Sequence, residues 1–149
     1  MTVISDEVAE FVQNERLGYV ATVSPDCKPN LSPKGSIIRS GPESLAFADI
    51  RSPDTVENLE SNDAVEVSVI SPIIRRGYLF SGRGHIHKSG ALFDDLIKKF
   101  RDMGIQSPIN TVVVIDVDHI SDTKSPLYDL GYTEEQIKDT WKRNYFENS

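Results

Sequence analysis

The sequence has few of the features that assign a chain to several common classes of protein. Its 149 residues include one cysteine, Cys27, which excludes an intramolecular disulfide and a zinc site built on several thiolates. No apolar run reaches the length of a membrane span. The N-terminal stretch MTVISDEVAEFVQNE lacks the basic start and apolar centre of a signal peptide. We therefore expect a cytoplasmic protein that does not contact membranes.

Positive charge is also scarce. The net charge is −7 at pH 7, from 23 acidic and 16 basic residues. Nucleic-acid binders need a basic face because neutralising phosphate groups drives their affinity, so this composition argues against DNA or RNA as the partner. Against the acidic background, the cations between residues 28 and 51 form a distinct local group.

Familiar catalytic motifs are missing as well. The chain has no Gly-x-Ser-x-Gly, no P-loop and no Gly-x-Gly-x-x-Gly between a strand and a helix. Cys27 lies in a predicted turn at a position that often takes glycine, which indicates a sequence variation rather than a catalytic thiol. His85, His87 and His119 lie on predicted strands without a carboxylate- or cysteine-rich partner element. We therefore expect no metal site, and we assign no catalytic residue.

The hydrophobic pattern predicts a mainly β (α+β) fold. A chain of this length buries enough surface to fold without disulfides or metals. The predicted strands are 19–24, 30–38, 44–49, 64–70, 77–87 and 111–120. Because short turns and short helices join them, they suit an antiparallel barrel better than a doubly wound parallel sheet. We expect one domain, residues 1–149, in which helices flank six strands.

Four helices are predicted from their caps and apolar stripes. Ser5 fits the cap of a first helix. Ser52, followed by proline at the first helical position, begins a short second helix. An apolar stripe over residues 92–100 predicts the third, and the sequence TEEQ has the capping-box spacing for a C-terminal helix at about 133–146.

One group of polar residues has the composition of a phosphate site. Lys34 lies on the second predicted strand, and Arg51, Ser52 and Thr55 lie around the start of the second helix. Free N–H groups at a helix N-terminus, two hydroxyls and two cations together suit a phosphate. A capped helix with two solvated cations explains the same residues. The pattern leaves both interpretations open.

At these residues the sequence resembles the pyridoxamine 5′-phosphate oxidase-like, FMN-binding split-barrel family. The matching segments are Gly18–Ser24 with PDCKPNLSPKGS after it, LAFADIRSPDTVENLESNDAVEVSV, and GYLFSGRGHIHKSG. The segment SPLYDLGYTEEQIKDTWKRNYF resembles the tail of one subgroup of these proteins. The resemblance covers about residues 18–146 and implies a six-stranded split barrel. It also implies a homodimer with FMN held in clefts between the two subunits.

The resemblance further implies which residues hold the cofactor. In the family, the second strand and the loop into the short helix bind the phosphate, and nearby backbone lies along the flavin. The candidates carried over to this chain are Pro33, Lys34, Arg51, Ser52, Thr55, Asn58 and, contributed across the dimer, Arg83. FMN rather than FAD is expected because a second nucleotide-binding signature is absent from the sequence.

The C-terminus departs from that of true pyridoxamine phosphate oxidases. Those enzymes end in a segment with tryptophan and arginine followed by Arg-Leu-x-Pro, whereas this chain ends WKRNYFENS. It also lacks the basic residues expected to grip the phosphate of the vitamin, so we do not carry over the oxidase activity. The leading hypothesis is an FMN-dependent oxidoreductase of unidentified substrate, with NADH or NADPH as a candidate reductant.

Two alternatives come from other classes. One is a non-catalytic flavin-binding or sensing protein. The other is a split barrel that binds haem or a deazaflavin, and haem would have only His85, His87 and His119 as axial ligands.

Overall fold

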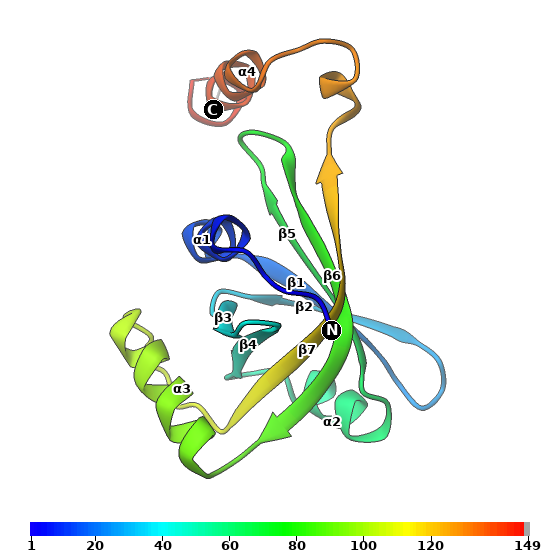
Figure 1. Ribbon diagram of the computed structural model, residues 1–149, viewed down its shortest axis with the longest axis vertical. Helices are drawn as coiled ribbons and strands as arrows, with labels where there is room; N and C mark the ends of the chain where they lie inside the picture. Colours follow the sequence, from blue (N-terminus) through cyan, green and yellow to red (C-terminus); the bar gives the residue numbers. More distant parts are fainter. Residues whose placement is uncertain (148–149) are drawn as a thin grey trace.

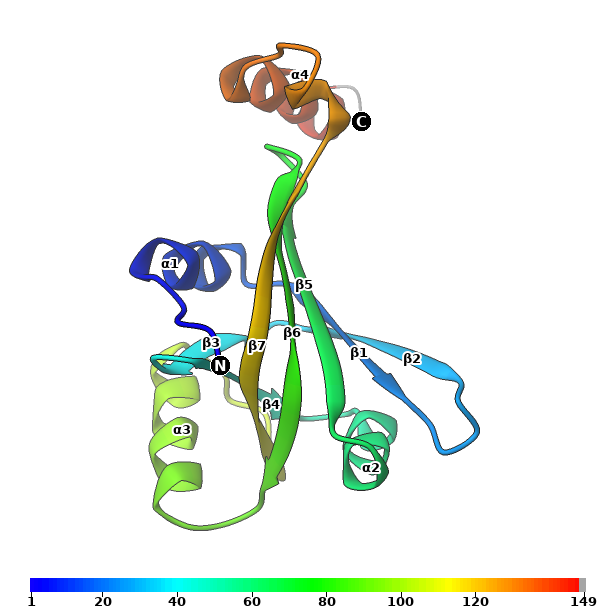
Figure 2. The same cartoon turned by 45° about the vertical axis from the view of Figure 1, so that its right-hand side comes forward.

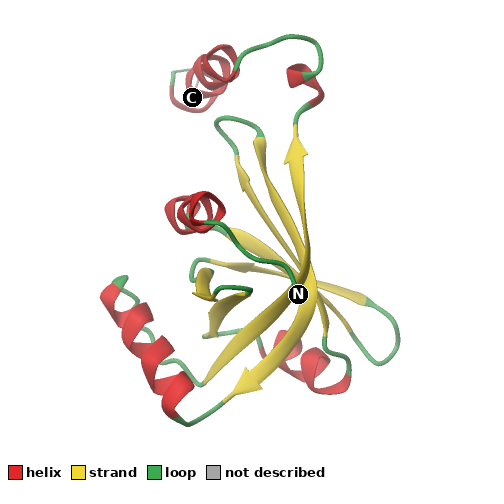
Figure 3. Ribbon diagram, in the orientation of Figure 1, coloured by secondary structure: helices red, strands yellow, loops and turns green. Residues whose placement is uncertain are grey.

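One antiparallel sheet carries the fold in the computed structural model, which describes residues 1–147 (Figures 1 and 3). Along the chain the elements are α1 (Asp6–Glu15), β1 (Gly18–Val23), β2 (Pro29–Lys34), β3 (Ile38–Gly41), β4 (Ser44–Asp49), α2 (Pro53–Ser61), β5 (Ala64–Ser71), β6 (Arg76–His87), α3 (Ala91–Asp102), β7 (Thr111–Lys124), a 3-10 turn η1 (Pro126–Tyr128) and α4 (Glu134–Phe146). The expected mainly β fold with flanking helices is confirmed.

The sheet has one more strand than the sequence predicted. Within residues 1–147, seven strands pair in the order β2-β1-β5-β6-β7-β4-β3. The single strand expected at 30–38 is divided into β2 and β3, which lie at opposite edges of the sheet. Because only the residues from Gly35 to Ile37 separate them, the two edges meet and the sheet curls into a split barrel. The Ser36 hydroxyl ties this connection to β4 by accepting the Ala48 N–H at 2.9 Å.

The barrel interior holds the larger of two apolar clusters. Val20, Leu45, Phe47, Val67 and Phe80 are fully buried there, and α1 closes one end of the cluster. β5 alternates buried and more exposed residues, as expected for a strand with one face toward the core.

The second apolar cluster lies on the outside of the barrel, under α3. Leu96 and Phe100 of α3 pack against Ala46, Val112 and Val114. Because the barrel core covers the other face of β4 and β7, both strands are buried on both sides over part of their length. This double burial explains why TVVVI is the most apolar strand segment of the sequence.

The β5–β6 hairpin and the end of β7 extend away from the barrel and carry α4 (Figures 1 and 2). Arg75, at the hairpin tip, places its guanidinium 3.5 Å from the centre of the Trp141 ring and donates to the Tyr145 hydroxyl at 3.1 Å. Thr133 and Gln136 form a capping box at the start of α4. The tail is thus docked at the hairpin tip, far from the start of α2.

Within residues 1–147, no helix is both long and apolar enough to cross a membrane.

Candidate functional site

Three polar side chains of β2 face the start of α2. Asn30, Ser32 and Lys34 alternate along the strand and therefore share one face. The Asn30 amide donates to the Thr55 hydroxyl at 3.4 Å, and the Ser32 hydroxyl lies 3.0 Å from that of Ser52. The Lys34 ammonium donates to the same Ser52 hydroxyl. These contacts fix the first turn of α2 against β2.

Ser52 occupies the N-cap position of α2, but its side chain does not cap the helix. Its hydroxyl is engaged by Lys34 and Ser32, and its backbone N–H donates to Asp49 Oδ1 at 2.8 Å. The expected side-chain cap is therefore wrong. No hydrogen bond from the Ser52 side chain therefore occupies the first-turn N–H groups of α2.

A cleft of about 500 Å³ opens beside these groups. Ser32 and Lys34 of β2 line one part of it, together with Arg51 and Ser52 from the loop before α2. The segment of residues 104–107, which follows α3, also lines the cleft. Arg101 holds this segment by donating to the carbonyl oxygens of residues 105 and 107, each at 2.8 Å. Two cations and two hydroxyls thus share the lining of the cleft with a segment that has no ionisable side chains.

The two cations of the cleft differ in their surroundings. Lys34 is 6 % exposed, and its ammonium lies 3.9 Å from Asp49 Oδ1 and 5.4 Å from the centre of the Phe47 ring. Burial lowers the pKa of Lys34, and the charge of Asp49 partly opposes that effect. Arg51 is exposed at the mouth of the cleft. The alternative of two solvated cations therefore fails for Lys34.

The candidates Pro33, Lys34, Arg51 and Ser52 all line this one cleft. Their assignment to FMN remains a prediction, but the structure brings them together from two separate segments of the chain.

The other three candidates lie outside the lining of the cleft. Thr55 is 0 % exposed, and its hydroxyl accepts from Asn30. Asn58 is buried and donates to the hydroxyl of Thr22 on β1 at 3.1 Å. Arg83 is exposed on β6 and pairs with Asp63 at 2.8 Å. None of these three side chains lines the cleft in the described chain.

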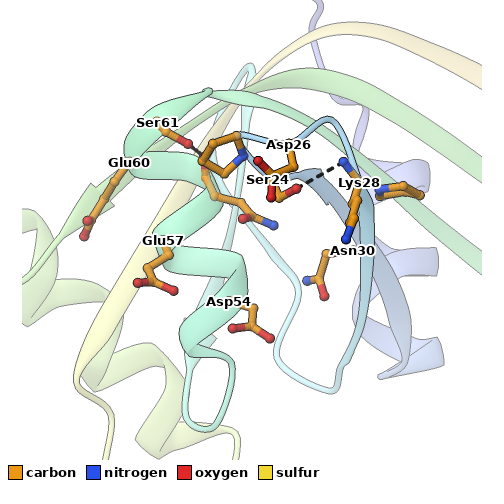
Figure 4. A pocket seen from close by; sticks show the side chains of 11 residues that line it. Ser24, Asp26, Lys28, Asn30, Asp54, Glu57, Glu60 and Ser61 are labelled. Atoms are coloured by element: carbon orange, nitrogen blue, oxygen red, sulfur yellow. Dashed lines mark hydrogen bonds between the residues drawn. The ribbon is translucent and has the colours of Figure 1, made fainter.

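A larger cavity of about 650 Å³ lies between the β1–β2 turn and α2 (Figure 4). Its carboxylates are Asp26, Asp54, Glu57 and Glu60, against one lysine, Lys28. Such an excess of negative charge disfavours a phosphate. The smaller cleft is therefore the candidate anion site.

Cys27, in the β1–β2 turn, has a φ angle of 61°. This left-handed conformation explains why glycine often takes this position.

The histidines lie away from both cavities. His85 Nε2 is 2.9 Å from Asp116 Oδ2 on the neighbouring strand, and both side chains are partly exposed. Among the described residues, no group of three or more His, Cys, Asp or Glu side chains is arranged to hold a metal ion.

Residues 4–124 match the family model described as pyridoxamine 5′-phosphate oxidase. The chain belongs to the pyridoxamine 5′-phosphate oxidase family. No curated protein matches the chain.

Several solved structures share the fold of this chain. HupZ from Group A Streptococcus is 26 % identical, with a TM-score of 0.74 over 82 % of this chain and 95 % of HupZ. An FMN-binding protein from Syntrophomonas wolfei is 16 % identical, with a TM-score of 0.69 over 80 % of this chain and 86 % of that one. An F420 reductase is 21 % identical, with a TM-score of 0.59 over 79 % of this chain and 98 % of that one. At 16 % and 21 % identity, the last two structures are similar to this chain in fold alone.

Two parts of the cleft in this oxidase-family chain were missed from the sequence. Ser32 lies two residues before Lys34 on the same strand face, so strand alternation would have found it. The segment 104–107 carries no motif, and only the packing of α3 on the sheet brings it to the cleft.

α4 begins after the residues that match the oxidase family.

Proposed function

We propose that this chain is an FMN-binding oxidoreductase that holds the FMN phosphate in the cleft between β2, the start of α2 and residues 104–107. The observation that carries the proposal is the convergence of Lys34, Arg51 and Ser52, from two separate segments of the chain, on one cleft beside the start of α2. This donor set fits a phosphate monoester, which offers several acceptor oxygens and about −1.5 to −2 charge at pH 7. The family assignment and the FMN-binding neighbour from Syntrophomonas wolfei support it.

The protein's part is binding and orientation. Lys34 and Arg51 neutralise the phosphate charge, and Ser52 and Ser32 offer hydroxyl groups to its oxygens. Because Lys34 is buried, its interaction with an anion is screened less than that of a surface cation. Bound FMN would supply two-electron transfer with a small redox substrate, for which NADH and NADPH are our candidate reductants in the cytoplasm.

The absorption spectrum of the purified protein, followed by mass spectrometry of the heat-released cofactor, tests this function. We expect a flavin spectrum and FMN. Recovery of FAD alone, or a Soret band from haem, would contradict the proposal. A deazaflavin is the second candidate, favoured by the F420 reductase of the same fold. Turnover with NADH or NADPH then separates an enzyme from a non-catalytic flavin-binding or sensing protein.

We further propose that a second copy of the chain covers the outer face of β1 and β2. Tyr19 and Pro33 are paired neighbours on this face, and Leu31 follows two residues away with 65 % of its surface exposed. Tyr19 is also exposed, and Pro33 lines the cleft. An apolar face that adjoins the cleft suits a homodimer in which each subunit helps to cover the other's cofactor.

Replacing Leu31 by lysine is expected to dissociate this dimer. The side chain is exposed in the single subunit, so the substitution should disturb assembly and leave the fold intact. Light scattering at micromolar concentration should give twice the 16.6 kDa chain mass for the parent and the monomer mass for Leu31→Lys. Leu130→Lys is the matched control, because Leu130 is 73 % exposed in the distant tail. A monomeric parent that still binds flavin would refute the dimer.

A further inference from the structure

Asp49 is out of place beside an anion site. It ends β4, is 8 % exposed, and lies beside Lys34, one of the two cations proposed to bind a phosphate. A buried carboxylate here should repel a dianion. Its presence calls for a compensating role.

Two contacts of Asp49 suggest that role. Oδ1 accepts the Ser52 N–H at 2.8 Å and lies 3.9 Å from the Lys34 ammonium. The first contact closes the chain between residues 49 and 52, so it sets the direction in which Arg51 leaves the loop. The second gives a buried ammonium a counter-charge before any ligand arrives.

Among residues 1–147, Asp49 is the charged group that acts on Lys34, and the nearest carboxylate of α2, Asp54, lines the other cavity. β2 contributes Ser32, β4 contributes the Phe47 ring, and the neighbouring residue of β1 is Gly18. The loop before α2 brings Arg51, a like charge, and residues 104–107 bring no titratable side chain. Among these groups, the Asp49 carboxylate is the one that favours the protonated lysine.

We propose that Asp49 is a positioning residue of the phosphate site, which fixes the Arg51–Ser52 turn through the Ser52 amide and keeps Lys34 charged inside the fold. The inference rests on the proposed function for the identity of the anion. Asp49 itself does not contact the phosphate. Its contribution appears as the pH dependence of binding, since a neutral lysine attracts a dianion far less than an ammonium does.

The variant Asp49→Asn separates this role from simple repulsion. Asparagine keeps an oxygen that can accept the Ser52 N–H but has no charge. Glu57→Gln is the matched control, because it removes one carboxylate from the exposed side of α2, away from Lys34. Both variants start from the same parent protein, freed of cofactor.

The first measurement needs no cofactor. The lysine side chains are labelled with ¹³C, the Lys34 signal is assigned from its loss in Lys34→Met, and each protein is titrated by NMR. We expect the pKa of Lys34 to fall in Asp49→Asn and to be unchanged in Glu57→Gln. An unchanged Lys34 pKa in Asp49→Asn would overturn the inference.

The second measurement is the affinity for FMN and for riboflavin between pH 7 and pH 9.5. In Asp49→Asn, FMN affinity should fall with rising pH by up to about tenfold per pH unit above the pKa of Lys34, because binding then requires proton uptake. The affinity of the parent and of Glu57→Gln for FMN should depend less steeply on pH, and the affinity for riboflavin should not depend on pH.

If Asp49→Asn binds FMN more tightly and with the same pH dependence as the parent, Asp49 only repels the phosphate. If Asp49→Asn loses affinity for FMN and riboflavin to the same extent, the role of Asp49 is purely structural. If FMN binds Lys34→Met and Arg51→Ala as tightly as the parent, the proposed function fails, while the NMR titration still decides the effect of Asp49 on Lys34.

Discussion

Arg51→Ala is expected to weaken FMN binding by about ten- to a hundredfold and to leave the fold intact. A charge-assisted hydrogen bond contributes about 1.5–3 kcal/mol, and about 1.4 kcal/mol corresponds to a factor of ten in affinity. Arg51 is exposed at the mouth of the cleft and belongs to neither apolar cluster, so its removal opens no cavity in the core. The measurement is a titration of FMN into cofactor-free protein, followed by flavin fluorescence.

Lys34 needs a different substitution, because it is buried beside Asp49. Lys34→Met keeps most of the apolar stem and removes the ammonium that lies over the Phe47 ring. We expect a loss of FMN affinity of the same order as for Arg51→Ala. A moderate fall in stability should accompany it, because Asp49 loses its counter-charge while its bond to the Ser52 amide persists. Urea denaturation separates that effect from the loss of binding.

Riboflavin and Lys28→Ala are the controls for both variants. Riboflavin lacks the phosphate, so it should bind the parent weakly and change little in either variant. Lys28 lines the acidic cavity rather than the cleft, so its removal should not weaken FMN binding. Unchanged FMN affinity in Arg51→Ala and Lys34→Met would place the phosphate elsewhere and reject the assignment made from the sequence. Arg83→Ala adds a test across the dimer, since it should weaken binding only if the partner subunit completes the site.

Gly82→Ala is expected to destabilise the fold by about 3 kcal/mol, the upper end of the usual cost of overpacking. Gly82 lies in β6 opposite an irregularity in β7, where the pairing shifts between Ser81–His119 and Gly82–Val117. A Cβ at this position would lie 2.0 Å from the backbone oxygen of Asp116. Backbone cannot yield there without breaking the β6–β7 pairing that spans the barrel and its projecting hairpin.

Gly84→Ala provides the comparison two residues along the same strand. A Cβ at Gly84 would meet the end of the Leu59 side chain at 2.9 Å, and a side chain can adjust where backbone cannot. We expect a cost of about 1 kcal/mol at this position. The free energy of unfolding of both variants is measured by urea denaturation. The dependence of that free energy on urea concentration is compared with the parent's, since an unchanged slope means that stability alone has changed. Equal losses for the two would show that the backbone contact at Gly82 is not the cause.

Local patterns in the sequence predicted much of the architecture. Three correct predictions depend only on residues a few positions apart: the alternation of β5, the cap at Ser5 and the capping box of TEEQ. The Ser5 hydroxyl accepts the Val8 N–H at 3.2 Å, as expected for a cap. The same kind of reasoning erred at Ser52. Serine suits a cap, but Lys34 of β2 donates a hydrogen bond to the Ser52 hydroxyl, which therefore does not cap α2.

The sequence by itself determined the mainly β class, the approximate places of the four helices and a group of polar residues whose composition suits a phosphate, because these follow from side-chain periodicity and short-range chemistry. Only the tertiary structure decided that residues 30–38 serve both edges of the sheet, since that depends on how far the barrel curves. It also decided that Lys34 is buried beside Asp49 and that residues 104–107 help to line the cleft. These features join segments 15 to 75 or so residues apart, and burial and charge pairing at such separations arise from packing that local sequence does not specify.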